Sequence, residues 1–122
     1  MINLKTDISS KRGNGLTGGI RKFIQQKPRI ISPGLNRRAV LLTKYVEASK
    51  NRRNRTLRRQ RFFCGVELLR KATKSDLICT RETQSGMSYE FKGTTPSGEE
   101  ITIHIREEIK GKDKLLYLIS TF

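Results

Sequence analysis

A histidine and an arginine two positions apart are the residues of this chain best suited to chemistry. His104 and Arg106 lie in segment 100–106, where isoleucines at positions 101, 103 and 105 alternate with polar residues. Alternation with period two is typical of a β-strand that buries one face. We therefore expect Thr102, His104 and Arg106 to lie side by side on a polar face. Tyr89 or Glu90, on the preceding strand, can flank them.

These side chains have the chemistry that cutting RNA without a metal requires. An imidazole can take a proton from a ribose hydroxyl or return one, and a guanidinium can neutralise charge that develops on a phosphate. A hydroxyl near the end of the chain can serve the leaving oxygen if the last strand pairs with segment 100–106. The predicted catalytic residues are His104, Arg106, Ser120 and Thr121. We expect neither a metal nor a cofactor.

Each of these residues also has a structural interpretation. A lone strand histidine is often a packing residue, and Arg106 can form an exposed ion pair with Glu107 or Glu108. Ser120 and Thr121 can simply complete a strand.

Charge is unevenly distributed along the chain. The net charge is +15, and residues 1–61 carry seventeen Lys and Arg against two acidic residues, whereas residues 62–122 carry nine of each sign. Such segregation is typical of a phosphate-binding surface. A solvated basic tail and an anionic membrane surface are the alternatives, but the basic half lacks the bulky apolar face of a membrane anchor.

The densest cluster is segment 50–61, with seven cations and no acid. Ordinary helices mix charges of both signs, so this cluster favours a nucleic-acid partner, RNA rather than DNA. The predicted nucleic-acid-binding residues are Lys50, Arg52, Arg53, Arg55, Arg58, Arg59 and Arg61, together with Lys11, Arg12, Arg37 and Arg38.

The expected fold class is α+β, with a basic N-terminal arm, one or two helices and a four-stranded antiparallel sheet. Glycines interrupt residues 1–32, which we interpret as a basic arm, and residues 33–122 as a single domain. Ser32 and Pro33 resemble the start of a helix that runs to about residue 49, and a second helix is expected at about 55–73. Residues 76–122 alternate and contain turn signals at 95–98 and 111–113, which predicts a meander.

Several other classes find no support in the sequence. No run of 18 apolar residues exists and the N-terminus lacks the features of a secretory signal, so we expect a cytoplasmic protein without a membrane partner. Cys64 and Cys79 fit reduced thiols, although a disulfide between them stays open. Glycines at 13, 15 and 18 match GxGxxG, but no strand is expected before them.

Four short motifs resemble a known family. They are YEFKG at 89–93, TPSGE at 95–99, IHIREE at 103–108 and LYLISTF at 116–122, preceded by a helical segment. Over residues 55–122 this order is similar to the toxin-type ribonucleases of the barnase–EndoU–colicin–RelE (BECR) superfamily, of the kind carried by phages and bacterial polymorphic toxin systems. The resemblance implies one or two helices before a four-stranded antiparallel sheet whose open face cuts RNA without a metal.

The residues that this resemblance carries over are His104, Arg106, Ser120 and Thr121. A mechanism with two histidines is excluded because the chain has one. The long basic arm extends beyond the part of the chain that the resemblance covers, and we expect it to be an RNA- or ribosome-binding extension or a surface for an acidic antitoxin or immunity protein.

Two other functions stay open. The first is a non-enzymatic nucleic-acid-binding protein, such as a ribosome-associated, nucleoid or phage regulatory factor. The second is docking of the basic half onto an acidic protein, for instance as an inhibitor.

Overall fold

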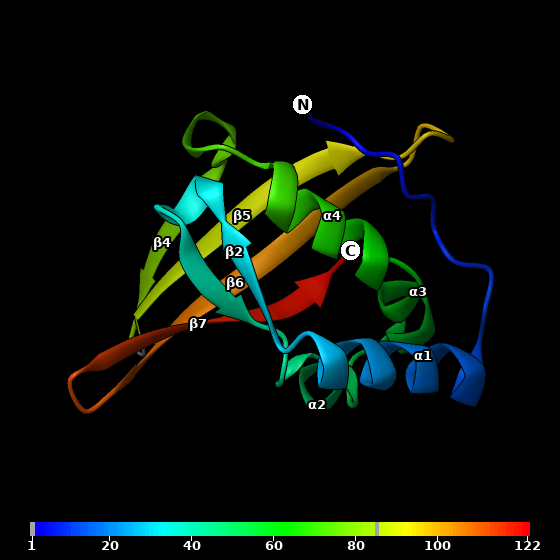
Figure 1. The fold of residues 1–122 in the computed structure, drawn as a ribbon, viewed down its shortest axis with the longest axis horizontal. Coiled ribbons are helices and arrows are strands. Elements are labelled where there is room, and N and C mark those ends of the chain that lie inside the picture. Colours follow the sequence, from blue (N-terminus) through cyan, green and yellow to red (C-terminus); the bar gives the residue numbers. More distant parts are fainter. Residues whose placement is uncertain (1, 85) are drawn as a thin grey trace.

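The computed structural model describes residues 2–84 and 86–122, and over these residues the chain is a mixed α+β fold with four α-helices and one curled seven-stranded sheet (Figure 1). The helices are α1 (Gly13–Gln26), α2 (Tyr45–Ser49), α3 (Arg55–Gln60) and α4 (Phe62–Lys71). The strands are β1 (Ile2–Asn3), β2 (Arg29–Ser32), β3 (Arg38–Leu41), β4 (Cys79–Thr83), β5 (Gly86–Thr94), β6 (Glu100–Lys110) and β7 (Asp113–Thr121). Among the helices described, none is long and apolar enough to cross a membrane.

The C-terminal strands form the expected meander, in which β4, β5, β6 and β7 pair antiparallel in chain order. Both turn signals are confirmed, since Gly98 and Gly111 adopt positive φ angles of 89° and 62° between the strands that they connect. Positive φ is costly for residues with a Cβ atom, so glycine suits both turns.

The prediction of a four-stranded antiparallel sheet is wrong. β7 also pairs in parallel with β3, β3 pairs antiparallel with β2, and β1 pairs in parallel with the end of β5. The three additional strands come from the first 41 residues. The pairing of β1 with β5 and of β3 with β7 joins segments far apart in sequence and leaves no local signal, because it depends on which edge of the sheet is free.

The helix expected from Pro33 to about residue 49 is also wrong. Pro33 begins only a short 3-10 helix (Pro33–Leu35), after which Asn36 and Arg37 take positive φ angles of 57° and 60° and reverse the chain into β3. A helix begins only at Tyr45. Val40 is fully buried beside β7, and strand pairing there prevails over a short local helical pattern.

The second expected helix, at about 55–73, is helical but is divided into two helices. Arg61 separates α3 from α4, and α4 ends at Lys71. Gly65 lies so close to the sheet that a Cβ atom there would be 2.5 Å from Cγ2 of Thr121 and 3.1 Å from Cγ2 of Ile103. The glycine weakens the helix locally but allows α4 to pack tightly against β6 and β7.

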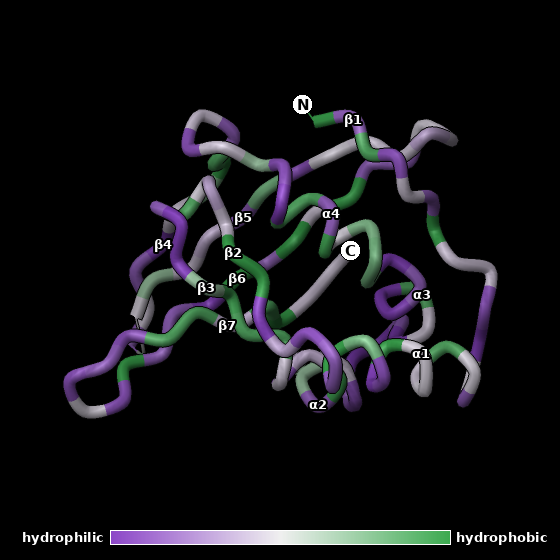
Figure 2. The backbone as a smooth tube through the Cα atoms, viewed as in Figure 1, coloured by the Kyte–Doolittle hydropathy of each residue, from purple (hydrophilic) through white to green (hydrophobic). Residues whose placement is uncertain are grey.

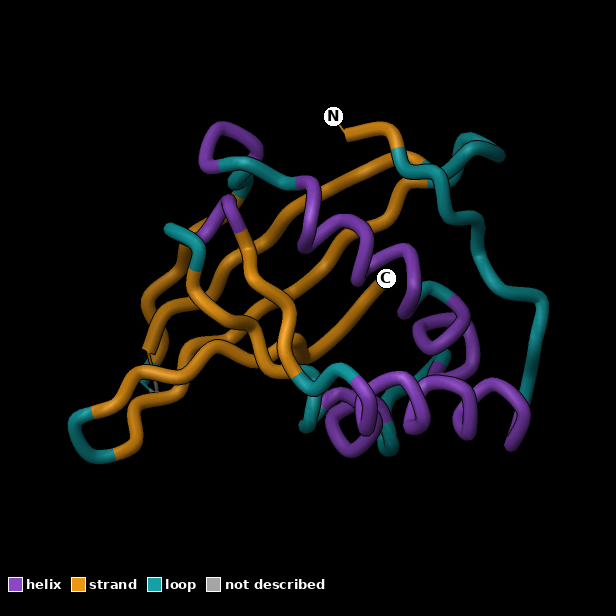
Figure 3. The backbone as a smooth tube through the Cα atoms, viewed as in Figure 1, coloured by secondary structure: helices purple, strands orange, loops and turns teal. Residues whose placement is uncertain are grey.

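Residues 1–32, interpreted from sequence as an arm, contain β1, α1 and β2. Leu16 and Ile20 of α1 and Ile30 of β2 are buried in the same core as α4 and the sheet. Leu16, Ile20 and Phe23 are spaced by four and three positions, which places them on one helix face. Figure 3 shows α1 as a continuous helix, and Figure 2 shows its hydrophobic positions alternating with hydrophilic ones.

The core lies between α4 and the sheet that curls around it (Figure 1). Phe91 of β5 and Ile101, Ile103 and Ile105 of β6 are fully buried there. Because neighbouring strand residues point to opposite faces, the residues between these positions project from the side of the sheet that α4 does not cover.

Candidate active site

The uncovered face of β4, β5 and β6 contains a pocket of about 320 Å³. Its lining side chains come from alternate positions of three neighbouring strands, so all of them project from one face. The lining residues are Cys79, Arg81 and Thr83 of β4, Ser88 and Glu90 of β5, and His104 and Arg106 of β6.

Strand register brings a carboxylate to the histidine. Glu90 pairs with His104 across β5 and β6, and Glu90 Oε1 lies 3.6 Å from His104 Nδ1. The other ring nitrogen, Nε2, lies 3.3 Å from the Ser88 hydroxyl. The side chains of His104 and Glu90 are 30% and 29% exposed, so the pair is held by its neighbours yet open to solvent.

Arg81 and Arg106 flank Ser88, which lies two residues from Glu90 on the same face of β5. Ser88 pairs with Arg81 on one side and with Arg106 on the other. The small serine side chain between two long cations leaves space for an anion above it. Arg81 is exposed, and within residues 2–84 and 86–122 no carboxylate forms an ion pair with it.

Arg106 is oriented by a carboxylate on its own strand. Its Nη2 lies 3.3 Å from Oε2 of Glu108, and Glu108 Oε1 accepts a hydrogen bond from Lys44 Nζ at 2.7 Å. The hydrogen bond from Lys44, followed by that from Arg106, lowers the pKa of Glu108 below its ordinary value. Glu108 therefore stays ionised and holds Arg106 beside the pocket.

Ser120 and Thr121, the other two predicted catalytic residues, do not line the pocket. Ser120 pairs with His104 across β6 and β7, but it is buried and its hydroxyl accepts a hydrogen bond from Arg58 Nη1. The methyl group of Thr121 faces Gly65 of α4, and its hydroxyl lies 2.6 Å from that of Tyr45 in α2 and donates to the carbonyl of Arg58 in α3 at 2.6 Å. Thr121 thus lies on the face opposite the pocket and has a packing role.

The predicted nucleic-acid-binding residues do not form one surface. Lys50, Arg52, Arg53 and Arg55 are exposed around the loop between α2 and α3, a hydrophilic stretch in Figure 2. Arg59, in contrast, is buried and donates to the Ser49 hydroxyl at 2.9 Å, the Thr17 hydroxyl at 3.0 Å and the Val46 carbonyl at 3.1 Å. It joins α3 to α1 and α2 and cannot reach a ligand.

The remaining predicted cations also lie outside the pocket. Arg38 forms an ion pair with Glu107 at 3.0 Å, and Arg61 donates to the Leu57 carbonyl at 2.7 Å. Lys11, Arg12 and Arg37 are exposed, the first two before α1 and the third before β3.

Sequence reasoning missed Arg81 and Ser88 and identified Glu90 only as one of two flanking candidates. The alternation in β5 places Ser88 and Glu90 on one face and was available as a signal. Which face of β5 meets His104 depends on register, and Arg81 enters the site only because β4 adds to the edge of β5.

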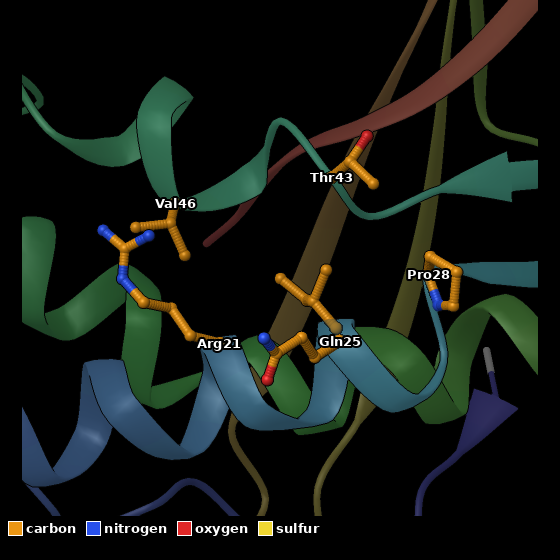
Figure 4. A pocket seen from close by; sticks show the side chains of 6 residues that line it. Arg21, Gln25, Pro28, Thr43 and Val46 are labelled. Carbon is orange, nitrogen blue, oxygen red and sulfur yellow. The ribbon is translucent and has the colours of Figure 1, made fainter.

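A second pocket, of about 440 Å³, lies between α1 and α2 (Figure 4). Figure 4 shows Arg21 and Gln25 of α1 facing Thr43 and Val46 across it, with Pro28 at one end. Of its lining side chains only Arg21 carries a charge. It contains no group that accepts or donates protons near neutral pH, so the smaller pocket on β4–β6 is the better candidate for catalysis.

Within the part of the chain that the structure describes, no group of three or more His, Cys, Asp or Glu side chains is placed to hold a metal ion. Comparisons of the chain with protein-family models, with curated proteins and with solved structures found no match.

Proposed function

We propose that the protein is an endoribonuclease that cuts RNA through attack of a ribose 2′-hydroxyl on the adjacent phosphate, without a metal. The observation that supports this most is the contact between Glu90 and His104 in a pocket that also contains Arg81 and Arg106. The pair provides a proton acceptor and a proton donor, and the arginines provide a site for the phosphate.

The scissile phosphate lies above Ser88, where Arg81 and Arg106 contact its non-bridging oxygens. Arginine suits this task because its planar fork matches two oxygens at once. The Ser88 hydroxyl donates a third hydrogen bond. The positive charge of both arginines stabilises the dianionic phosphorane more than the monoanionic diester, and this difference lowers the barrier.

Glu90 and His104 move the two protons of the reaction. An ionised carboxylate only accepts, so Glu90 takes the proton of the 2′-hydroxyl. The 2′-oxygen then forms a bond to phosphorus while the bond from phosphorus to the 5′-oxygen breaks. His104 Nε2, which faces Ser88, gives a proton to that leaving oxygen. The products are a 2′,3′-cyclic phosphate and a 5′-hydroxyl, and proton exchange with water restores both side chains.

The test uses a DNA oligonucleotide that contains a single ribonucleotide, incubated with the purified protein in EDTA. We expect one cut, on the 3′ side of the ribonucleotide, with a mass that identifies the cyclic phosphate. His104→Ala and Glu90→Gln should each slow it at least about 10²-fold. Glu82→Gln is the matched control, since Glu82 is exposed on β4 outside the pocket. An intact substrate, or equal cutting by His104→Ala, would refute the proposal.

The exposed cations at Lys50, Arg52, Arg53 and Arg55 support a second candidate, a nucleic-acid-binding protein without enzymatic activity. Replacing all four by glutamine should flatten the dependence of log affinity on log salt, by about 0.7 for each phosphate of a single strand that these cations neutralise. A steep salt dependence together with an intact substrate would favour this candidate over the ribonuclease. An unchanged slope would exclude this loop as the binding surface.

A further inference from the structure

Two exposed apolar side chains lie where the end of β7 meets α3. Leu57 of α3 is 50% exposed and Phe122, which follows β7, is 44% exposed. They line one cavity of about 200 Å³, together with Asn54, Arg58, Arg61 and Glu100. An exposed apolar surface that polar and charged side chains surround is typical of an interaction site.

The backbone of Phe122 and its aromatic ring each have a partner. The backbone of Phe122 exchanges hydrogen bonds with Thr102, from Thr102 N–H to Phe122 O at 2.6 Å and from Phe122 N–H to Thr102 O at 2.8 Å. The guanidinium of Arg58 lies over the ring, 5.3 Å from its centre, and also donates to the Ser120 hydroxyl. The backbone that carries the ring is therefore ordered before any ligand arrives, and Arg58 lies over the ring, which together lower the entropic cost of binding.

The position of the ring relative to the candidate active site follows from strand register. Phe122 is paired with Thr102, and Ser120 with His104. Thr102 and His104 are two residues apart on the same strand, so they lie about 7 Å apart on one face. The ring thus lies on the His104 side of the sheet, one step along β6. Figure 1 shows this end of the chain next to α3, which carries Arg58.

We propose that Phe122 is a stacking platform for one nucleobase of single-stranded RNA, next to the nucleotide whose phosphate is cut. Nucleobases stack on aromatic rings, and because Arg58 lies over one face of the Phe122 ring, the base stacks on the other face. Arg61 and the exposed cations from Lys50 to Arg55 continue from this platform and bind the following phosphates. The location of the cut phosphate rests on the proposed ribonuclease function, whereas stacking itself does not.

A flexible single strand fits this surface better than a duplex. Stacking on Phe122 requires a base that has left its neighbours, which a paired strand supplies only after unpairing. We therefore expect unpaired RNA to bind more tightly than the same sequence in a hairpin stem.

The chain contains no tryptophan, so Phe122→Trp provides a fluorescent probe at this one position. The ligand is an oligonucleotide of about ten nucleotides with 2′-O-methyl groups, which the proposed reaction cannot cut. We expect quenching of the indole fluorescence on binding. Ile31→Trp is the matched control, because Ile31 is also exposed but lies on β2, separated from β6 by two strands. It should show no quenching.

Affinity gives the second readout. Fluorescence anisotropy of a labelled oligonucleotide should show weakening of about tenfold or more for Phe122→Ala, because one base no longer stacks, and near-normal binding for Phe122→Trp. An abasic position moved through the oligonucleotide should weaken binding to the native protein but add little for Phe122→Ala.

No quenching at saturation, no binding, or equal affinity for Phe122→Ala would overturn the proposal. Quenching without cleavage in the chimeric oligonucleotide assay would retain the platform and reject the ribonuclease.

Discussion

The two faces of β6 show how one strand serves two purposes. Ile103 and Ile105 face α4 and are fully buried, whereas His104 and Arg106, between and beside them, line the open pocket. The sheet's period of two separates the residues that hold the fold together from those available for chemistry. Substitutions on the two faces should therefore affect different properties of the protein.

Arg58 and Arg59 repeat this contrast on α3. Arg59 is buried and donates hydrogen bonds to residues of α1 and α2. Arg58, in contrast, contacts Ser120 and Phe122 on the pocket side of the sheet. Both belong to one basic run in the sequence, yet only one can meet a ligand. A count of cations therefore overestimates the binding surface.

The sharpest test of the comparison pairs His104→Ala with Ile103→Ala. Loss of His104 should slow cleavage about 10²–10⁴-fold, because the leaving oxygen loses its proton donor. The free energy of unfolding should change little, since the histidine is partly exposed. Ile103→Ala should lower the free energy of unfolding by about 2–5 kcal/mol through the cavity it leaves under α4. Single-turnover cleavage and urea denaturation measure both, and a reversed pattern would contradict the separation of the faces.

A second test removes one phosphate-binding side chain. Arg81→Gln should slow cleavage about 10²-fold with little effect on stability, because Arg81 is exposed and stabilises charge that grows in the transition state. Arg70→Gln is the control, since Arg70 is an exposed arginine at the end of α4. Equal effects of the two substitutions on the cleavage rate would show that only overall charge matters.

The contrast between the two arginines predicts opposite results for Arg59→Ala and Arg58→Ala. Removal of Arg59 should lower the free energy of unfolding by about 2–3 kcal/mol, because three acceptors lose their donor and two of these hydrogen bonds are buried. Removal of Arg58 should reduce stability less and weaken oligonucleotide binding more. Thermal denaturation and fluorescence anisotropy measure stability and binding for both variants. Impaired binding without loss of stability in Arg59→Ala would contradict this assignment.

The smallest expected effect is at Glu67 of α4. Burial would raise the pKa of Glu67, but hydrogen bonds from Lys71 and from the backbone N–H groups of Lys5 and Thr6 outweigh it and lower the pKa to about 2. A lowered pKa gives stability that is present above the ordinary value of 4.5 and is lost as pH falls toward 2.

Glu67→Gln should therefore destabilise the protein by about 1–2 kcal/mol at neutral pH, with a difference from the native protein that shrinks below pH 4.5. Urea midpoints across this pH range measure it. The cleavage rate should be unchanged, because Glu67 lies on the helix that covers the other face. A difference that stayed constant down to pH 2 would contradict the proposed hydrogen bonds.

Local patterns predicted the meander well. Period two in β6, together with glycine in two turns, is a property of a few adjacent residues and needs no distant partner. The same alternation correctly placed His104 and Arg106 on one face, and both line one pocket. The helix expected from Pro33 does not form before Tyr45, because Val40 and Leu41 pair with β7, about 75 positions later in the chain.

By itself, the sequence determined the α+β class, the hairpins of the C-terminal half, the polar face of β6 and the excess of positive charge in the first half. Only the tertiary structure decided that Glu90 and Ser88 meet His104, that Arg81 joins them, and that Thr121 and Arg59 face away from the pocket. The physical reason is that alternation defines two faces of each strand, while register and pairing between distant segments decide which faces and residues meet.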